Sequence, residues 1–264
     1  WSRKKVSVQA FFLAFAILFS VDLISIVNDW PSIIAEFSTA EPVSNQILSK
    51  ISSSFFRLVI YPIAFSLFVG LIQGWKRMQS NISVSKALVI GSSIGVVVKG
   101  FSSFLTFFLP STGPTWAKYE AAGSYLPIIE VALSPLKPFV ILSVVILLLF
   151  ASIDKLTDSW TYRRVFYASC MITFGLAFVA VIDNNISYWL VKGFSTGIIL
   201  FLFYIIVFRF HLAIIPFATA SMVILDVFQK SIYNAHPGTI PGGVLAITLT
   251  GLLSYYWYKK LAYT

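Results

Sequence analysis

The sequence predicts an all-α, polytopic membrane protein, and three observations lead to this class. Of the 264 residues, 58% are hydrophobic and 11% are charged, whereas an average soluble domain has about 25% charged residues. The mean hydropathy is +0.87, and a soluble fold of this composition would expose apolar patches that monomers rarely tolerate. The length provides for about eight to ten membrane spans with short links, so we treat 1–264 as a single transmembrane domain.

Eight apolar runs approach the length that crosses a bilayer. They cover 6–28, 53–74, 87–109, 126–152, 165–182, 187–208, 211–228 and 241–258. The link between the sixth and seventh runs, from Phe208 to His211, is very short and contains neither Gly nor Pro. The sequence therefore leaves two counts open: eight separate spans, or seven if these two runs form one bent element.

The segments between the runs carry their own patterns. Residues 29–52 begin with Asp-Trp-Pro and are amphipathic, so we interpret them as an outer segment lying at the membrane interface. Residues 110–125 form an outer loop in this topology. The fourth run contains Pro127, Pro135 and Pro138 in its outer half, and proline kinks or ends a helix. This half is either a surface segment before a shorter span or a broken helix at membrane depth.

Basic residues predict the orientation, because cytoplasmic loops carry an excess of Lys and Arg. With eight spans and the N-terminus inside, the outer loops hold only Lys50, Lys118 and Lys230. The inner loops hold twelve basic residues: Arg3, Lys4, Lys5, Lys76, Arg77, Lys86, Lys155, Arg163, Arg164, Arg209, Lys259 and Lys260. Both termini are therefore predicted to be cytoplasmic. The formal charge of +9 fits this asymmetry with the lipid bilayer as partner, and we expect no nucleic acid.

Charged side chains inside spans are the default candidates for function, since each costs about 2.5–3.5 kcal/mol at a helix centre on insertion scales. Lys99 lies near the middle of the third run, Asp22 in the outer third of the first, and Asp226 near the outer end of the seventh. They either line an ion or substrate pathway or, for Lys99, form an internal pair with an acid that fixes packing. Arg57 and Lys192 lie near outer ends and are interpreted as snorkelling side chains.

Gly91-Ser92-Ser93-Ile94-Gly95 matches the Gly-x-Ser-x-Gly pattern of serine hydrolases, but that pattern has meaning only at a strand-to-helix turn. Here it opens an apolar run, and Gly91 and Gly95 are four residues apart, as in close helix packing. We therefore expect these two glycines to serve helix packing. Ser92 and Lys99 share a helix face, which gives a weaker Ser–Lys dyad hypothesis.

Other catalytic signatures are absent from the sequence. It has two histidines, His211 and His236, and contains neither His-Glu-x-x-His nor a Cys/His cluster. We therefore predict no catalytic residues, no metal site and no cofactor. The chain is expected not to be an enzyme by itself.

Several segments together resemble a known family. They are Pro114 to Tyr119 (PTWAKY), Ile153 to Arg164 (IDKLTDSWTYRR), and a tail with Pro216, Pro237-Gly238 and Pro241-Gly242. This set is similar to the non-catalytic membrane half of long bacterial proteins of the CPBP family, which are relatives of the CAAX prenyl proteases. The resemblance extends over about residues 55–258.

The chemistry of that family does not carry over, because its proteases use a Glu-Glu-x-x-x-Arg motif and this chain has no Glu-Glu pair. The resemblance implies a scaffold or accessory module in a bacterial cytoplasmic (inner) membrane, partnered by other membrane subunits or by a protease half. Two alternatives remain: a transporter or permease-like subunit that uses Lys99 and Asp22, and a structural subunit of a larger membrane complex.

Overall fold

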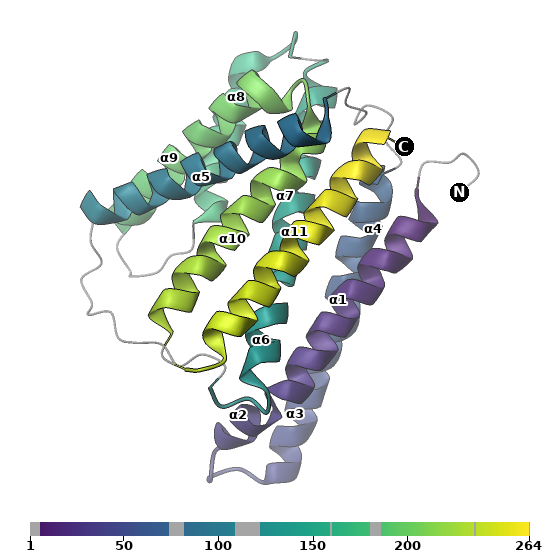
Figure 1. Ribbon diagram of the computed structural model, residues 1–264, viewed down its shortest axis with the longest axis vertical. Coiled ribbons are helices and arrows are strands. Elements are labelled where there is room, and N and C mark those ends of the chain that lie inside the picture. Colours follow the sequence, from purple (N-terminus) through teal and green to yellow (C-terminus); the bar gives the residue numbers. More distant parts are fainter. Residues whose placement is uncertain are drawn as a thin grey trace. The chain divides into compact units, whose positions relative to one another are not determined.

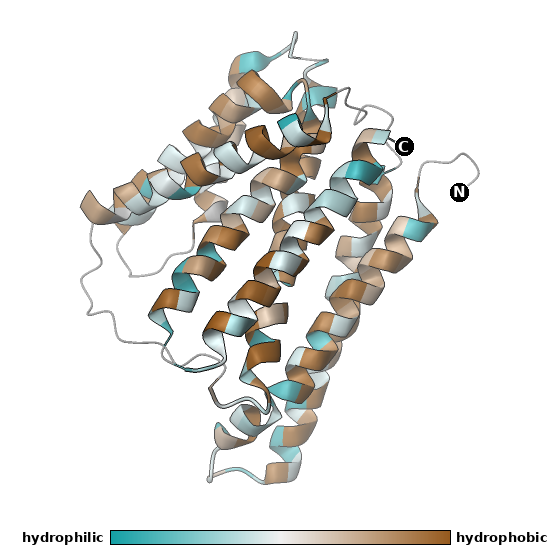
Figure 2. Ribbon diagram, viewed as in Figure 1, coloured by the Kyte–Doolittle hydropathy of each residue, from teal (hydrophilic) through white to brown (hydrophobic). Residues whose placement is uncertain are grey.

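The computed structural model describes residues 6–73, 82–108, 122–158, 160–179, 186–234 and 236–263. This part of the chain is helical and contains no strand (Figure 1), which confirms the all-α prediction. Apolar residues cover most of the helix surfaces, as Figure 2 shows in brown.

The helices follow one another with short links. In chain order they are α1 (Val8–Asn28), α2 (Trp30–Ala35), α3 (Val43–Phe55), the π-helix η1 (Phe56–Ile60), α4 (Tyr61–Gln73), α5 (Val84–Phe108), α6 (Pro127–Leu133), α7 (Leu136–Leu156), α8 (Arg164–Phe178), α9 (Ile186–Phe203), the π-helix η3 (Tyr204–Phe208), the 3-10 helix η4 (Leu212–Ile214), α10 (Ile215–Tyr233) and α11 (Thr239–Tyr263).

Seven helical segments in the described part of the chain are long and apolar enough to cross a membrane. They are Val8–Asn28, Val43–Gln73, Val84–Leu105, Pro127–Leu156, Ile186–Phe208, Leu212–Tyr233 and Thr239–Tyr263. The protein therefore has the architecture of a polytopic membrane protein. On which side of the membrane the termini lie stays a prediction.

The sequence left the count of seven or eight spans open at the link between the sixth and seventh runs. In the structure the run that falls short of a span is the fifth. The π-helix η3 ends at Phe208 and a new helical segment begins at Leu212, so the sixth and seventh runs are separate elements. The fifth run, 165–182, corresponds to α8, which has 15 residues in the described part of the chain. Such a helix is about 22 Å long, shorter than a hydrocarbon layer of about 30 Å.

Two predicted segments have a different form in the structure. Residues 29–52 contain α2 and the first turns of a continuous helix of 31 residues, Val43–Gln73, and their position at the membrane interface stays a prediction. In the fourth run, Ser134 and Pro135 separate α6 from α7. Whether α6 lies at the membrane surface or at membrane depth stays a prediction. The expected outer loop 110–125 lies almost entirely outside the described residues.

The chain forms two compact units, and the first contains α1 to α4 with η1, α6, the start of α7 and the adjoining parts of α10 and α11. In this unit α1 runs antiparallel to α4, and the Ser7 amide donates a hydrogen bond of 2.9 Å to the Gly70 carbonyl. The start of α11 packs closely on α6: a Cβ added at Gly242 would lie 2.7 Å from Val131 Cβ.

The second unit contains α5, the rest of α7, α8, α9, η3, η4, most of α10 and the end of α11. Its core includes the fully buried rings of Phe150 and Tyr204, whose centroids are 5.2 Å apart. On α5, a Cβ at Gly91 would collide with Phe217 and one at Gly95 with Ser221 and the Ala218 carbonyl. Both glycines therefore lie against α10. The serine-hydrolase pattern between them is mid-helix rather than at a turn.

The α8–α9 hairpin depends on glycines at its crossing. A Cβ at Gly175 would strike the Gly193 carbonyl and the Gly197 backbone, and one at Gly197 would strike the Ile172 backbone. Small residues at such crossings let helix backbones approach closely in membranes. Because the obstructing atoms belong to the backbone, a side-chain rotation does not relieve the clash.

We expect Gly197→Ala to lower the melting temperature in detergent, with a loss of about 1–3 kcal/mol as is typical of overpacking. Gly100→Ala on α5 is the matched control, because no heavy atom lies within 4 Å of its added Cβ. Thermal unfolding monitored by size-exclusion fluorescence compares the two variants. Equal melting temperatures for both would contradict the close α8–α9 crossing.

Candidate functional site

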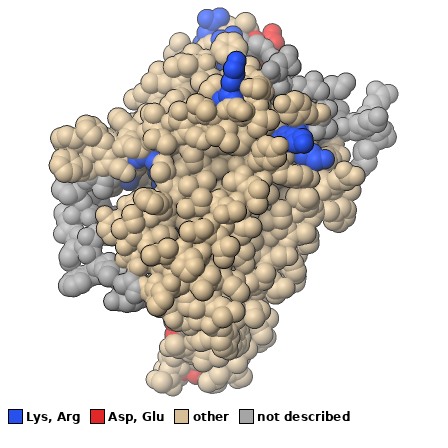
Figure 3. Space-filling model, viewed as in Figure 1, with Lys and Arg blue, Asp and Glu red and all other residues tan. Residues whose placement is uncertain are grey.

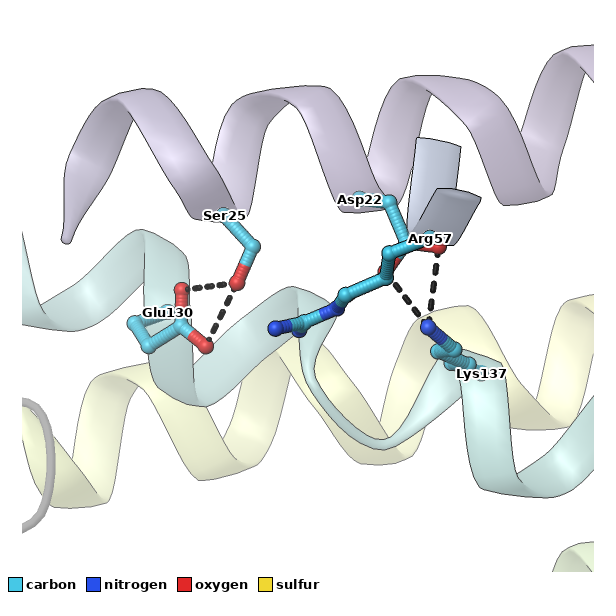
Figure 4. A network of polar contacts seen from close by, with 5 residues as sticks. All are labelled: Asp22, Ser25, Arg57, Glu130 and Lys137. Atoms are coloured by element: carbon cyan, nitrogen blue, oxygen red, sulfur yellow. Dashed lines mark hydrogen bonds and ion pairs between the residues drawn. The ribbon is translucent and has the colours of Figure 1, made fainter. Parts of the chain in front are cut away.

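Three charged side chains from three helical segments converge in the first unit (Figure 4). The Lys137 Nζ lies 2.7 and 2.9 Å from the two carboxylate oxygens of Asp22, and the Arg57 Nε lies 3.6 Å from Asp22 Oδ1. The Asp22 side chain is 2% exposed, Lys137 24% and Arg57 54%. A buried carboxylate on α1 is thus neutralised by cations from α7 and η1.

A second set of polar contacts lies farther along the same face of α1. The Ser25 hydroxyl lies 2.8 Å from both carboxylate oxygens of Glu130, to which it is the donor. The Asn28 side chain donates to the Leu126 carbonyl at 3.1 Å and accepts from the Leu126 amide at 2.8 Å. Because Leu126, the N-cap residue of α6, provides no side-chain cap, Asn28 satisfies backbone groups that would otherwise be costly to bury.

The break between α6 and α7 allows one chain segment to reach both parts of this network. Pro135 lacks a backbone N–H and interrupts the helix, while its carbonyl accepts the Phe139 amide at 3.1 Å and so starts α7. On α1, residues 22 and 25 are three apart and therefore on one face. Glu130 before the break contacts Ser25, and Lys137 after it contacts Asp22.

Arg57 lies on η1, one of the two π-helices in the described part of the chain. Short π-helical turns are frequent at functional sites. The Lys137 ammonium also lies 6.0 Å from the centroid of the Tyr61 ring, the first residue after η1. A cation near an aromatic face gains a further electrostatic attraction when it is desolvated.

Carboxylates outnumber cations in this region. Arg57 attracts Glu130 and Asp29 as well as Asp22. Burial raises the pKa of the Asp29 carboxyl above its ordinary value, and the charge of Arg57 opposes this rise. A guanidinium has five N–H donors, so Arg57 can interact with more than one of these acids. We refer to Asp22, Ser25, Arg57, Glu130 and Lys137 as the charge cluster.

The predicted pathway residues are distributed over both units. Asp22 belongs to the charge cluster, and its ion-pair partners are Lys137 and Arg57. Lys99 is half-buried on α5 in the second unit, and Asp226 is half-buried on α10 in the first. A pathway role for these three residues stays a prediction.

Sequence reasoning missed the partners of Asp22. Arg57 was interpreted as a snorkelling side chain, and Lys137 was given no role. The signal that points to them is charge complementarity. Asp22 is the one acid in the first apolar run, and an acid inside a span needs a cation at the same depth in the membrane. Among the described residues, no group of three or more His, Cys, Asp or Glu is placed to hold a metal ion.

The fold and its buried charge cluster define a multi-pass, α-helical membrane protein. Comparison with protein-family models, with curated protein sequences and with solved structures finds no match to this chain. The assignment of a function therefore depends on the residues themselves.

We expect Asp22→Asn to lower the free energy of unfolding by about 3 kcal/mol, because removing one partner of a buried pair strands the other charge. The double variant Asp22→Asn/Lys137→Met is expected to recover most of this loss, since neutral pairs often replace buried ion pairs without cost. Thermal unfolding in detergent measures both.

Lys192→Met is the control for that series. It removes a cation from an apolar helix outside the cluster, where Lys192 Nζ contacts the Tyr188 hydroxyl at 3.1 Å. Its expected effect is small. A double variant that is no more stable than Asp22→Asn alone would contradict the ion pair between Asp22 and Lys137.

Proposed function

We propose that the chain is a non-enzymatic polytopic membrane domain, a scaffold or accessory module of a CPBP-like membrane protein. The observation that carries this proposal is the pairing of Asp22 with Lys137 and Arg57. The ion pairs between these charges join α1, η1 and α7. Burying these charges costs free energy of desolvation. In return, the ion pairs fix the relative positions of three helices, which is what a scaffold requires.

The docking of α6 supports the same role. Asn28 bonds both the amide and the carbonyl of Leu126, and Tyr125 N–H donates to the Asn28 carbonyl at 2.9 Å. In this proposal the module resides in a bacterial cytoplasmic membrane with both termini inside. It presents a rigid helical surface to other membrane subunits or to a protease half.

The proposal is tested by cross-linking the tagged full chain in native membranes and identifying partners by mass spectrometry after extraction in mild detergent. We expect one stoichiometric membrane protein that carries a Glu-Glu-x-x-x-Arg motif. The double variant Asp22→Asn/Lys137→Met should retain this partner, because it preserves the fold without the charges. A monodisperse monomer with no cross-linked membrane partner would overturn the scaffold role.

A second candidate function is transport of protons or small cations, and the helix break favours it. Discontinuous helices often build the sites of transporters, and here Glu130 and Arg57 lie beside such a break. Because Arg57 interacts with Asp22, Asp29 and Glu130, proton uptake by Glu130 would release Arg57 toward the other two acids. Asp22 is shared by both candidates, whereas Lys99 belongs to the pathway hypothesis alone.

Proton flux into proteoliposomes distinguishes the two functions. A transporter is expected to show flux in the parent chain, at least a tenfold loss in Glu130→Gln, and a comparable loss in Lys99→Ala, all with unchanged melting temperature. The scaffold proposal expects background flux in every variant. Flux in the parent chain that both substitutions leave intact would contradict the assignment of these two residues.

A further inference from the structure

Buried polar groups connect the described residues of the α7–α8 loop in the second unit. The Thr157 side chain is fully buried, and its hydroxyl donates to the Ile153 carbonyl at 2.7 Å and accepts from the Trp160 amide at 3.0 Å. The Thr157 carbonyl accepts the amides of Thr161 and Tyr162 at 2.8 and 2.9 Å. One threonine therefore organises the turn that leads into α8.

Trp160 anchors this loop to the core of the second unit. Its side chain is buried, and its ring packs edge-on against Tyr204 with centroids 5.4 Å apart and beside Phe201 at 5.9 Å. Asp158, Trp160 and Arg163 have positive φ values of 48°, 65° and 48°. Non-glycine residues adopt this region only when their surroundings impose it, so the loop is built to present its side chains in fixed directions.

The side chains that the loop presents are basic and apolar. Lys155, Arg163 and Arg164 are exposed, with Asp158 as the exposed acid among them. Next to them Val165 is 81% exposed and Phe166 61%. Figure 3 shows basic side chains gathered where α7 meets α8, beside a carboxylate.

The combination of exposed basic and apolar side chains indicates which class of ligand would bind here. Exposed cations attract a phosphate, but they do not account for large apolar side chains at the start of α8. A ligand that carries a phosphodiester and acyl chains together satisfies both groups, and in a membrane protein that ligand is a lipid of the adjoining leaflet. The guanidinium of Arg163 lies 5.0 Å from the centroid of the Tyr162 ring, which orients one of the two arginines.

We propose that the α7–α8 loop binds the headgroup of an anionic phospholipid, with Arg163 and Arg164 holding the phosphate and Val165 and Phe166 contacting the acyl chains. The lipid would fix the depth of α8, whose 15 described residues do not by themselves match the thickness of a bilayer.

The test measures binding of phosphatidylglycerol and of phosphatidylcholine with identical acyl chains to the purified full chain, by native mass spectrometry and by the rise in melting temperature in mixed micelles. We expect phosphatidylglycerol to bind more tightly than phosphatidylcholine. Arg163→Gln/Arg164→Gln should weaken phosphatidylglycerol binding about 30-fold, on the basis of two surface cations. Arg163→Lys/Arg164→Lys, which keeps the charge, should retain most of it.

Lys259→Gln/Lys260→Gln at the end of α11 is the matched control, because it removes the same charge from two other exposed residues. An equal loss in this control would show unspecific attraction to anionic lipid and would overturn the proposed site. Val165→Asn/Phe166→Asn should also weaken lipid binding without altering the response to inorganic phosphate. Protection by inorganic phosphate alone, equal to that by phosphatidylglycerol, would identify a free-anion site and contradict the lipid.

Discussion

An ionised carboxylate removed from water must keep its counter-charge, and the arrangement of the first unit follows from this constraint at Asp22. The carboxylate is almost fully buried on α1, where an unpaired charge would cost several kcal/mol. Lys137 must therefore remain at the start of α7, and Arg57 on η1. The α6–α7 break immediately precedes α7, where Lys137 lies, Asn28 follows Asp22 on α1, and Arg57 belongs to the π-helix η1.

The two units stabilise their helices by different means. The first unit joins helices with ionic and hydrogen-bonded contacts, which are directional and fix rotation about a helix axis. The second unit joins α8 to α9 through glycines and packs α7, η3 and Trp160 through aromatic rings. Without a hydrophobic driving force between helices in lipid, both close packing and polar contacts are needed to choose one arrangement.

The sequence predicted the helices because apolar runs of span length are visible in a single chain. It also indicated a break in the fourth run, since proline acts locally, but not the depth of that break in the membrane. It did not predict that Asp22 pairs with Lys137, since these residues are 115 positions apart and no local pattern links them. The helical continuity from Val43 to Gln73 was missed for another reason: the polar turns of α3 look like a separate segment although the helix is continuous.

The length of that continuous helix has a consequence for the depth of the charge cluster. Its 31 residues measure about 46 Å, and even a tilt of 40° leaves about 35 Å along the membrane normal, more than a hydrocarbon layer of about 30 Å. The bond between Ser7 and Gly70 aligns its far end with the start of α1, so the hydrophobic mismatch falls at α3. With the α4 end of this helix at one membrane boundary, Arg57 lies only about 5–11 Å below the headgroups on the α3 side.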